Sequence, residues 1–281
     1  MTSINPVRYP GGKGRKEVVD GILSLVPSGR LQGRTWIEPF CGGCGLGLEL
    51  VNRGIVSRAV FNDADRRVIA MWHEIAYDSE WLIERIFDAD IDMRLFLESH
   101  DIANDDAASV RDVGFATFVL DRCCVSGYID GGVIGGKHQN GRYKLDCRFN
   151  KDTLAKRIRR VSELASGNRV SFVGPSDAID VIDGIHGGDT FLYVDPPYYQ
   201  KGHACYRTRI NHEELAECLR RRLDDGIPWL LSYDDCNEIR DMYQGCHFAR
   251  LPLTYVNNSV TRGRTSELLV SNFAFSEGRN G

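Results

Sequence analysis

The stretch Thr190-Phe191-Leu192-Tyr193-Val194-Asp195-Pro196-Pro197-Tyr198 decides the fold. Its first five residues form an unbroken apolar or β-prone run, which is typical of a buried strand in a parallel sheet. Two consecutive prolines then end the strand, because neither can donate a hydrogen bond to a neighbouring strand. The sequence therefore predicts an acidic side chain and an aromatic ring at the carboxyl end of a central strand, where open α/β sheets bind their ligands.

The corner from Asp195 to Tyr198 suits an amino group on a flat heterocycle. The Asp195 carboxylate and the Pro196 carbonyl can accept its two N–H donors, and the Tyr198 ring can stack on the heterocycle. These contacts favour attack by the nitrogen lone pair on an electrophile. An ordinary strand-ending turn with an aspartate cap is the alternative, and the corner by itself does not decide between them.

Composition limits the class of protein. The chain has 281 residues, 42% of them hydrophobic, which is enough for one large α/β domain or for a domain with an insertion. No apolar run reaches transmembrane length and residues 1–5 are not a signal peptide, so we expect a cytoplasmic protein without a membrane partner. The nine cysteines include a single Cys-x-x-Cys pair, Cys41 and Cys44, and we expect reduced thiols rather than a metal site or disulfides.

Charge is unevenly distributed. The formal net charge is −4, yet residues 137–160 contain nine basic residues against two acidic ones. Local basic density governs the binding of a polyanion more than the total charge does. A solvated helix face is the alternative explanation of this run.

The amino-terminal half contains the first part of a nucleotide-binding unit. Arg8 to Lys13 forms a proline- and glycine-containing loop, and residues 16–25 are predicted to be helical. Thr35 to Glu38 is a predicted strand, followed by a glycine-rich loop to Gly45 and a helix from Leu46 to Val51. Strand, glycine loop and helix are the start of a dinucleotide-type βαβ unit.

Asp63 ends the next predicted strand, residues 60–63, and lies 25 positions after Glu38. An acidic residue near this spacing often binds a ribose hydroxyl pair. A helix cap for the segment that continues through Val68 to Ile75 is an equally good interpretation.

Strand and helix stop alternating between about Met71 and Ala165, where helical patterns dominate. We therefore predict an insertion at residues 72–165 in a catalytic domain formed by 1–71 and 166–281. Asn140-Gly141 within it is a strong turn signal, which predicts a glycine-rich β-hairpin with polar and basic residues at its tip. Such a hairpin could enter a nucleic-acid groove, whereas a surface loop is the alternative.

Further strands complete the predicted sheet. Residues 170–173 and 229–232 are strand-like, and residues 248–256 and 266–273 are predicted to form a closing antiparallel pair. The fold class is therefore α/β, with a mostly parallel Rossmann-like sheet, an antiparallel closing strand and a helical insertion.

Four stretches occur in a characteristic order: Tyr9 to Lys13, Glu38 to Gly42, Asn62-Asp63 and Asp195 to Tyr198. Together they resemble the Dam-type, DPPY-containing (alpha-group) DNA adenine-N6 methyltransferases, with the insertion between the second strand and the DPPY strand. Residues 146–151, 231–235 and 265–269 are similar to those of phage and prophage members. The likeness covers nearly the whole chain.

The resemblance implies three sets of site residues. The catalytic corner that holds the target adenine is Asp195, Pro196, Pro197 and Tyr198. The residues around the cofactor S-adenosylmethionine are Tyr9, Gly12, Lys13, Glu38, Pro39, Phe40, Gly42, Asp63, Phe172, Asp177 and Asp195. The residues that face DNA are Arg122, Ser126, Tyr128, Lys137, His138, Gln139, Asn140, Arg142, Lys144, Arg262 and Arg264. Three positions depart from the family pattern: Cys44 stands where glycine is common, and Asp65 and Asp121 each replace a common asparagine.

The resemblance also implies an activity, namely site-specific methylation of adenine N6 in double-stranded DNA with a flipped-out target base. It requires no metal ion. Alternatives are an enzyme of low sequence specificity, one acting on RNA or on cytosine N4, and a non-catalytic DNA-binding module. A monomer or weak dimer is expected, encoded by a bacterium or a phage, and a restriction endonuclease is a conceivable functional partner.

Overall fold

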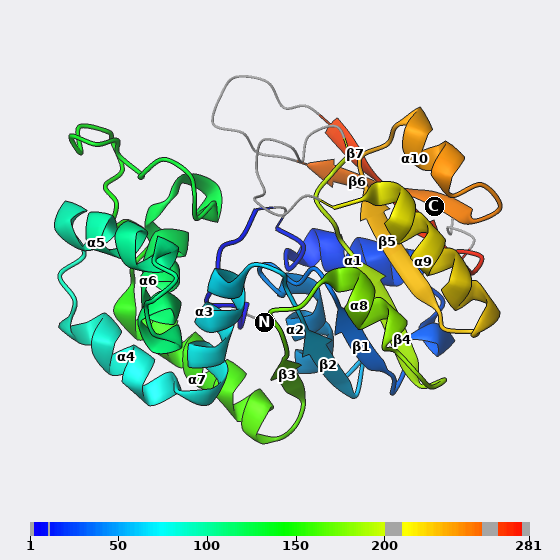
Figure 1. The fold of residues 1–281 in the computed structure, drawn as a ribbon, viewed down its shortest axis with the longest axis horizontal. Coiled ribbons are helices and arrows are strands. Elements are labelled where there is room, and N and C mark those ends of the chain that lie inside the picture. Colours follow the sequence, from blue (N-terminus) through cyan, green and yellow to red (C-terminus); the bar gives the residue numbers. More distant parts are fainter. Residues whose placement is uncertain (1–2, 11, 200–209, 255–263, 277–281) are drawn as a thin grey trace.

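A computed structural model describes residues 3–10, 12–199, 210–254 and 264–276 of the chain. Within these residues seven strands form one sheet in the order β3-β2-β1-β4-β5-β7-β6 (Figure 1). They are β1 (Thr35–Glu38), β2 (Arg58–Phe61), β3 (Val170–Phe172), β4 (Thr190–Val194), β5 (Trp229–Tyr233), β6 (His247–Thr254) and β7 (Arg264–Ser271). Strands β1 to β5 are mutually parallel, and β7 pairs antiparallel with β5 and β6. The predicted mostly parallel sheet with an antiparallel closing pair is confirmed.

Alternate residues of β4 enter two separate cores, one on each face of the sheet. Phe191 and Tyr193 stack against Trp36 of β1, with ring centroids 5.2 Å apart in both pairs. Leu192 and Val194 belong to the other core. All five residues of β4 are buried, because successive side chains of a strand point to opposite faces and both faces are covered.

Helices cover the two cores. The first core contains residues of α1 (Lys16–Leu25), α2 (Gly45–Asn52) and α3 (Arg66–Tyr77), and the second those of α8 (Ala178–Asp183), α9 (His212–Asp224) and α10 (Asn237–Met242). A short 3₁₀ turn, η1 (Ser28–Arg30), precedes β1. None of the described helices has the length and apolar character needed to cross a membrane.

The chain between β2 and β3 is helical, as predicted. It contains α3, α4 (Ser79–Asp88), α5 (Met93–Asn104), α6 (Val110–Cys123), the 3₁₀ turn η2 (Val125–Gly127) and α7 (Lys151–Ser166). In Figure 1, α4, α5 and α6 stand at one end of the molecule, away from the sheet. Side chains that accept a hydrogen bond from the first helical turn begin four of these helices, at Asp65, Asp92, Ser109 and Asn150. Helix α3 continues past residue 71, where we expected the insertion to begin.

The predicted β-hairpin in this region is wrong. Residues 128–150 form turns, and their one connection of β type is an isolated bridge between Cys124 and Val133. The Gln139 side chain holds the loop together from inside, since it donates to the carbonyls of Ile134 and Gly136 and accepts from the Leu145 N–H. Side-chain bonds to the backbone of this kind compete with strand pairing, and the glycines nearby have low strand propensity.

Candidate active site

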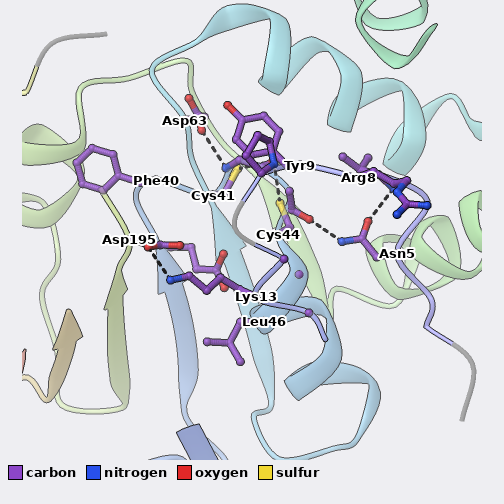
Figure 2. A pocket seen from close by; sticks show the side chains of 18 of the residues that line it. Asn5, Arg8, Tyr9, Lys13, Phe40, Cys41, Cys44, Leu46, Asp63 and Asp195 are labelled. Atoms are coloured by element: carbon purple, nitrogen blue, oxygen red, sulfur yellow. Dashed lines mark hydrogen bonds and ion pairs between the residues drawn. The ribbon is translucent and has the colours of Figure 1, made fainter. Parts of the chain in front are cut away.

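A cleft of about 1580 Å³ opens beside the carboxyl ends of β1 and β4 (Figure 2). Strand order reverses here, because the chain runs from β1 through β2 to β3 on one side and then crosses to β4 on the other side of β1. Ligands of doubly wound sheets bind at such a switch point. Nine of the predicted cofactor residues line the cleft: Tyr9, Gly12, Lys13, Glu38, Phe40, Gly42, Asp63, Asp177 and Asp195. Pro197, Arg122, Ser126 and Tyr128 also line it.

The amino-terminal loop packs directly on the glycine loop after β1. A Cβ atom at Gly42 would lie 2.6 Å from the Tyr9 ring, and one at Gly45 would lie 2.5 Å from the Gly14 nitrogen. Side chains at these two glycines would push the loops apart. Cys44 adopts a left-handed φ of 51°, which explains physically why glycine is common at this position.

Asp63 serves the glycine loop rather than a helix. Its Oδ2 accepts from the Gly42 N–H at 2.9 Å and its Oδ1 from the Asp65 N–H at 2.9 Å. Helix α3 is capped by Asp65, whose side chain accepts from the Arg67 N–H. Burial raises the pKa of Asp63 to about 6. Of the two interpretations of Asp63, the helix cap is wrong, and the ribose contact remains a proposal.

Glu38 ends β1 beneath the same loop. Its Oε1 accepts from the Trp36 indole N–H at 2.7 Å and from the Gly47 N–H at 2.8 Å. Burial raises the pKa of Glu38 to about 8, although both hydrogen bonds favour the charged form. A buried carboxyl that retains its proton near neutral pH is poised to ionise beside a cationic ligand.

Asp195 begins the corner after β4 and is held by two donors. The Lys13 ammonium lies 3.1 Å from Oδ1, and the Ser232 hydroxyl donates to the same oxygen at 2.8 Å. Among the described residues none is hydrogen-bonded to Oδ2. Burial raises the pKa of Asp195, with Lys13 opposing the shift. One oxygen of this carboxylate is therefore anchored and the other is available to a ligand.

Lys13 is the centre of a buried polar cluster. Its ammonium also bonds Ser232 at 3.2 Å, the Tyr198 hydroxyl at 3.4 Å and the carboxylate of Glu267 from β7. Burial opposes the charge on Lys13, but Asp195 and Glu267 outweigh it and raise the lysine pKa. The Tyr198 hydroxyl donates to Glu267, and burial raises the pKa of this phenol.

Several predicted residues lie outside the cleft lining. Phe172 is buried behind it, where its ring stacks on Trp72 at 5.1 Å. Pro39 and Pro196 are also buried. Asp177, in contrast, lines the cleft, and it also caps α8 by accepting from the Ile179 N–H.

The structure does not turn Arg122 toward solvent. Its side chain is buried and donates to the carbonyls of Arg148 and Pro6. Ser126 is exposed and Tyr128 is half-buried. The expected hairpin-tip residues are surface residues that do not line the cleft: Lys137, His138, Asn140, Arg142 and Lys144 are exposed, and Gln139 is half-buried. Arg262 and the side chain of Arg264 lie outside the described residues.

Four arginines gather at the end of the cleft next to the amino-terminal loop. Arg8, Arg122, Arg148 and Arg157 all line it, and the described residues include no ion-pair partner for any of them. Carbonyl oxygens hold three of the guanidinium groups, which leaves their positive charge in place. Burial and the neighbouring arginines lower the pKa of Arg122 to about 10. An anion bound here would offset the repulsion between the positive charges of these arginines.

Sequence reasoning missed the partners of Lys13 and Asp195. Glu267, Ser232 and Tyr193 lie within apolar strands and are buried, and Tyr193 is bonded to Ser232 at 3.0 Å. A charged residue inside an otherwise apolar run, such as Glu267 before Leu268 and Leu269, was the available signal. The arginine cluster was missed because three of its members are separated by long stretches of chain.

Comparisons with known proteins place the chain in a family. Two solved structures align over most of their length: precorrin 8W decarboxylase from Methanobacterium thermoautotrophicum, with 12% identity over 94% of this chain and 91% of that one (TM-score 0.39), and a conserved hypothetical protein from Streptococcus pyogenes, with 11% identity over 89% and 90% (TM-score 0.34). Similarity this low supports no argument about function. No curated protein matches significantly. The model of one family, described as D12 class N6 adenine-specific DNA methyltransferase, matches residues 9–257. The chain therefore belongs to the D12 class of N6 adenine-specific DNA methyltransferases.

Proposed function

We propose that this protein transfers a methyl group from S-adenosylmethionine to N6 of an adenine at specific sites in double-stranded DNA. The observation that carries the proposal is the Asp195 carboxylate, which has Oδ1 anchored by Lys13 and Ser232 and Oδ2 left for a donor at the cleft. An adenine amino group is such a donor. Membership of an adenine-specific DNA methyltransferase family favours this substrate over RNA or cytosine N4.

The residues of the cleft fit S-adenosylmethionine. The cofactor has two ribose hydroxyls and cationic groups, and when bound it supplies an electrophilic methyl group on sulfur. Asp63 would accept from the ribose hydroxyls, and Glu38 would face a cationic group. Tyr9 and Phe40 supply apolar surface, and Gly42 lets the backbone approach the ligand.

Asp195 and Tyr198 would then act on the target base. Oδ2 of Asp195 accepts one N6 hydrogen and the Pro196 carbonyl the other, while the Tyr198 ring stacks on the adenine. Asp195 and the Pro196 carbonyl would orient the N6 lone pair toward the methyl group, and Asp195 or water would accept the proton that N6 releases on transfer. Positioning supplies much of the rate acceleration, and no metal ion or covalent intermediate is required.

The target base has to leave the helix for this geometry to form. N6 of a paired adenine is bonded to thymine inside the stack, so we propose that the base flips into the cleft. The arginine cluster of Arg8, Arg122, Arg148 and Arg157 would hold a neighbouring phosphate. We assign target recognition to residues 72–165 and place the enzyme in the cytoplasm, where its DNA substrate lies.

Base-resolved mapping tests the proposal. Purified protein is incubated with S-adenosylmethionine and an unmethylated plasmid, and Asp195→Ala serves as the inactive control. We expect N6-methyladenine in one short motif for the wild type and none for the variant, which should keep its fold and much of its cofactor affinity. Asp195 is required for methyl transfer because its Oδ2 accepts a hydrogen of the adenine amino group, and alanine has no such acceptor.

Other outcomes would redirect the assignment. Methylated adenines in nearly every sequence context would keep the chemistry but remove site specificity. Methylation of cytosine, or of RNA, would mean that the substrate assigned here is wrong. Cofactor binding without turnover on any nucleic acid would favour a non-catalytic DNA-binding module, and near-wild-type turnover by Asp195→Ala would contradict the role of the corner.

A further inference from the structure

Glu267 is a buried carboxylate in the middle of an apolar strand. It is 3% exposed, and the next residues of β7, Leu268, Leu269 and Val270, are fully buried. Its Oε1 accepts from Lys13 and from the Tyr198 hydroxyl, whereas Oε2 is buried without a hydrogen-bond partner among the described residues. Even when it is paired, a buried carboxylate with one unsatisfied oxygen contributes little net stability compared with an apolar residue, which makes a purely structural role an unfavourable explanation.

Lys13 connects Glu267 to the carboxylate of Asp195. The ammonium bonds Glu267 on one side and lies 3.1 Å from Asp195 Oδ1 on the other. Ser232 reinforces the connection, since it bonds Lys13 at 3.2 Å and donates to Asp195 at 2.8 Å. A displacement of Lys13 would therefore displace the carboxylate that faces the substrate.

Glu267 also sets the charge of the cluster. Lys13 contributes one positive charge, and Asp195 and Glu267 contribute two negative charges when ionised. Without Glu267 the lysine would neutralise Asp195 and weaken it as an acceptor. With Glu267 the lysine charge is shared between two carboxylates, and the cluster keeps one net negative charge behind the cleft, which Asp195 lines. Positive charge develops on N6 as its new bond forms, and a fixed negative charge nearby stabilises that change.

We propose that Glu267 is a positioning residue for methyl transfer, which anchors Lys13 and the Tyr198 hydroxyl and keeps a net negative charge beside the target amino group. This inference rests on the proposed function. It requires no contact between Glu267 and the substrate, because the effect passes through Lys13 and Tyr198.

Glu267→Gln tests the proposal, since it keeps the size of the side chain and removes the charge. We expect kcat to fall about tenfold or more, with the KM for cofactor and for DNA changed by less than about threefold. The acid limb of the kcat profile should move to lower pH, because the charge on Glu267 raises the pKa of Asp195. Glu267→Asp should restore part of the rate, and Glu84→Gln, an exposed carboxylate of α4 that does not line the cleft, should resemble the wild type.

A double-mutant cycle tests the route through Lys13. In a Lys13→Met background Glu267→Gln should lower kcat by less than about twofold, because its main partner is already absent. The double variant lacks both members of the buried pair and leaves neither of these two charges unpaired. If Glu267→Gln alone does not fold, Glu267→Asp carries the test, because it keeps the charge and should keep the pH profile of the wild type while the shorter side chain lowers kcat.

Three outcomes would overturn the proposal. The first is an unchanged kcat in Glu267→Gln, and the second is a loss of rate that only follows lower thermal stability and leaves the pH profile unchanged. The third is an effect of Glu267→Gln on kcat that is as large in the Lys13→Met background as in the wild type. Adenine methylation by the wild type, measured in the same assay, reports separately on the proposed function.

Discussion

The Asp63 carboxylate accepts a hydrogen bond from the Gly42 N–H at 2.9 Å, so the end of β2 holds the glycine loop that follows β1. Oδ1 of Asp63 binds the Asp65 N–H, and each oxygen retains a second lone pair for a ligand. One side chain thus shapes the loop and faces the cleft. This part of the cleft is therefore held in shape by contacts within the chain.

Asp63→Ala should weaken cofactor binding. Both the loop contact and the acceptors for ribose hydroxyls are lost, and we expect the Kd for S-adenosylmethionine to rise about tenfold or more. Titration calorimetry measures the change. Asp65→Asn is the control, because asparagine still caps α3, and its Kd should remain near the wild-type value. An unchanged Kd in Asp63→Ala would contradict the ribose assignment.

Cofactor binding should release a proton from Glu38. In the free protein at about pH 7.5, Glu38 (pKa about 8) is largely protonated and Asp63 (pKa about 6) is ionised. A cationic group beside Glu38 favours its carboxylate, so calorimetry in two buffers of different ionisation enthalpy should detect release of up to about one proton. Glu38→Gln should abolish the release and Asp63→Asn should retain it. Binding without proton release in the wild type would show that no cation lies beside Glu38.

Removal of the Tyr198 ring should lower turnover more than cofactor affinity. Stacking of a base on an aromatic side chain contributes about 1–3 kcal/mol, so Tyr198→Ala should lower kcat/KM for DNA about tenfold or more. Tyr198→Phe keeps the ring and loses only the hydroxyl contacts with Glu267 and Lys13, so its kcat/KM should fall less. Steady-state kinetics on duplex DNA measure both. Equal rates for Tyr198→Ala and the wild type would remove stacking from the mechanism.

Asp121→Asn should change how stability depends on pH. Asp121 is buried, accepts from the Arg8 N–H, and has a pKa raised by burial to about 7. The pKa of Asp121 is higher in the folded protein than in the unfolded chain, so its contribution to the free energy of unfolding is fully present below about pH 4 and is lost as pH rises through about 7. About 1 kcal/mol of this contribution is lost between about pH 6 and pH 8. Asparagine keeps the acceptor and does not titrate.

Urea denaturation at several pH values measures this difference between the Asp121→Asn variant and the wild type. The variant should gain relative stability as pH rises. Identical pH dependence in the two proteins would mean that Asp121 does not titrate in this range.

Arg8→Ala and Arg157→Ala should each reduce the salt dependence of DNA binding. A lost phosphate contact lowers the slope of log Kd against log salt concentration by about one. Arg159→Ala is a matched control from the same helix as Arg157, because Arg159 is paired with Glu80 at 2.8 Å. A wild-type slope in Arg8→Ala and Arg157→Ala would exclude the cluster as a phosphate site.

The sequence by itself determined most of the sheet and the place of the corner from Asp195 to Tyr198. The apolar run of β4, the two prolines after it and the closing pair of β6 and β7 are local patterns, and each depends on the hydrogen-bonding capacity of a few consecutive residues. The order of motifs around Lys13, Glu38, Asp63 and Asp195 was enough to indicate an adenine methyltransferase. The sequence also indicated the helical segment between β2 and β3.

Only the tertiary structure decided which polar groups meet. Asp63 and Asp65 are both plausible helix caps in sequence, and the position of the Gly42 loop assigns them different tasks. Gln139 closes a loop where Asn140-Gly141 had indicated a hairpin. Glu267 contacts Lys13 because β7 pairs antiparallel with β5, which brings Glu267 close to the amino-terminal loop that contains Lys13. Such contacts depend on the relative placement of distant segments, which is set by the packing of the whole core and not by the pattern within any one of them.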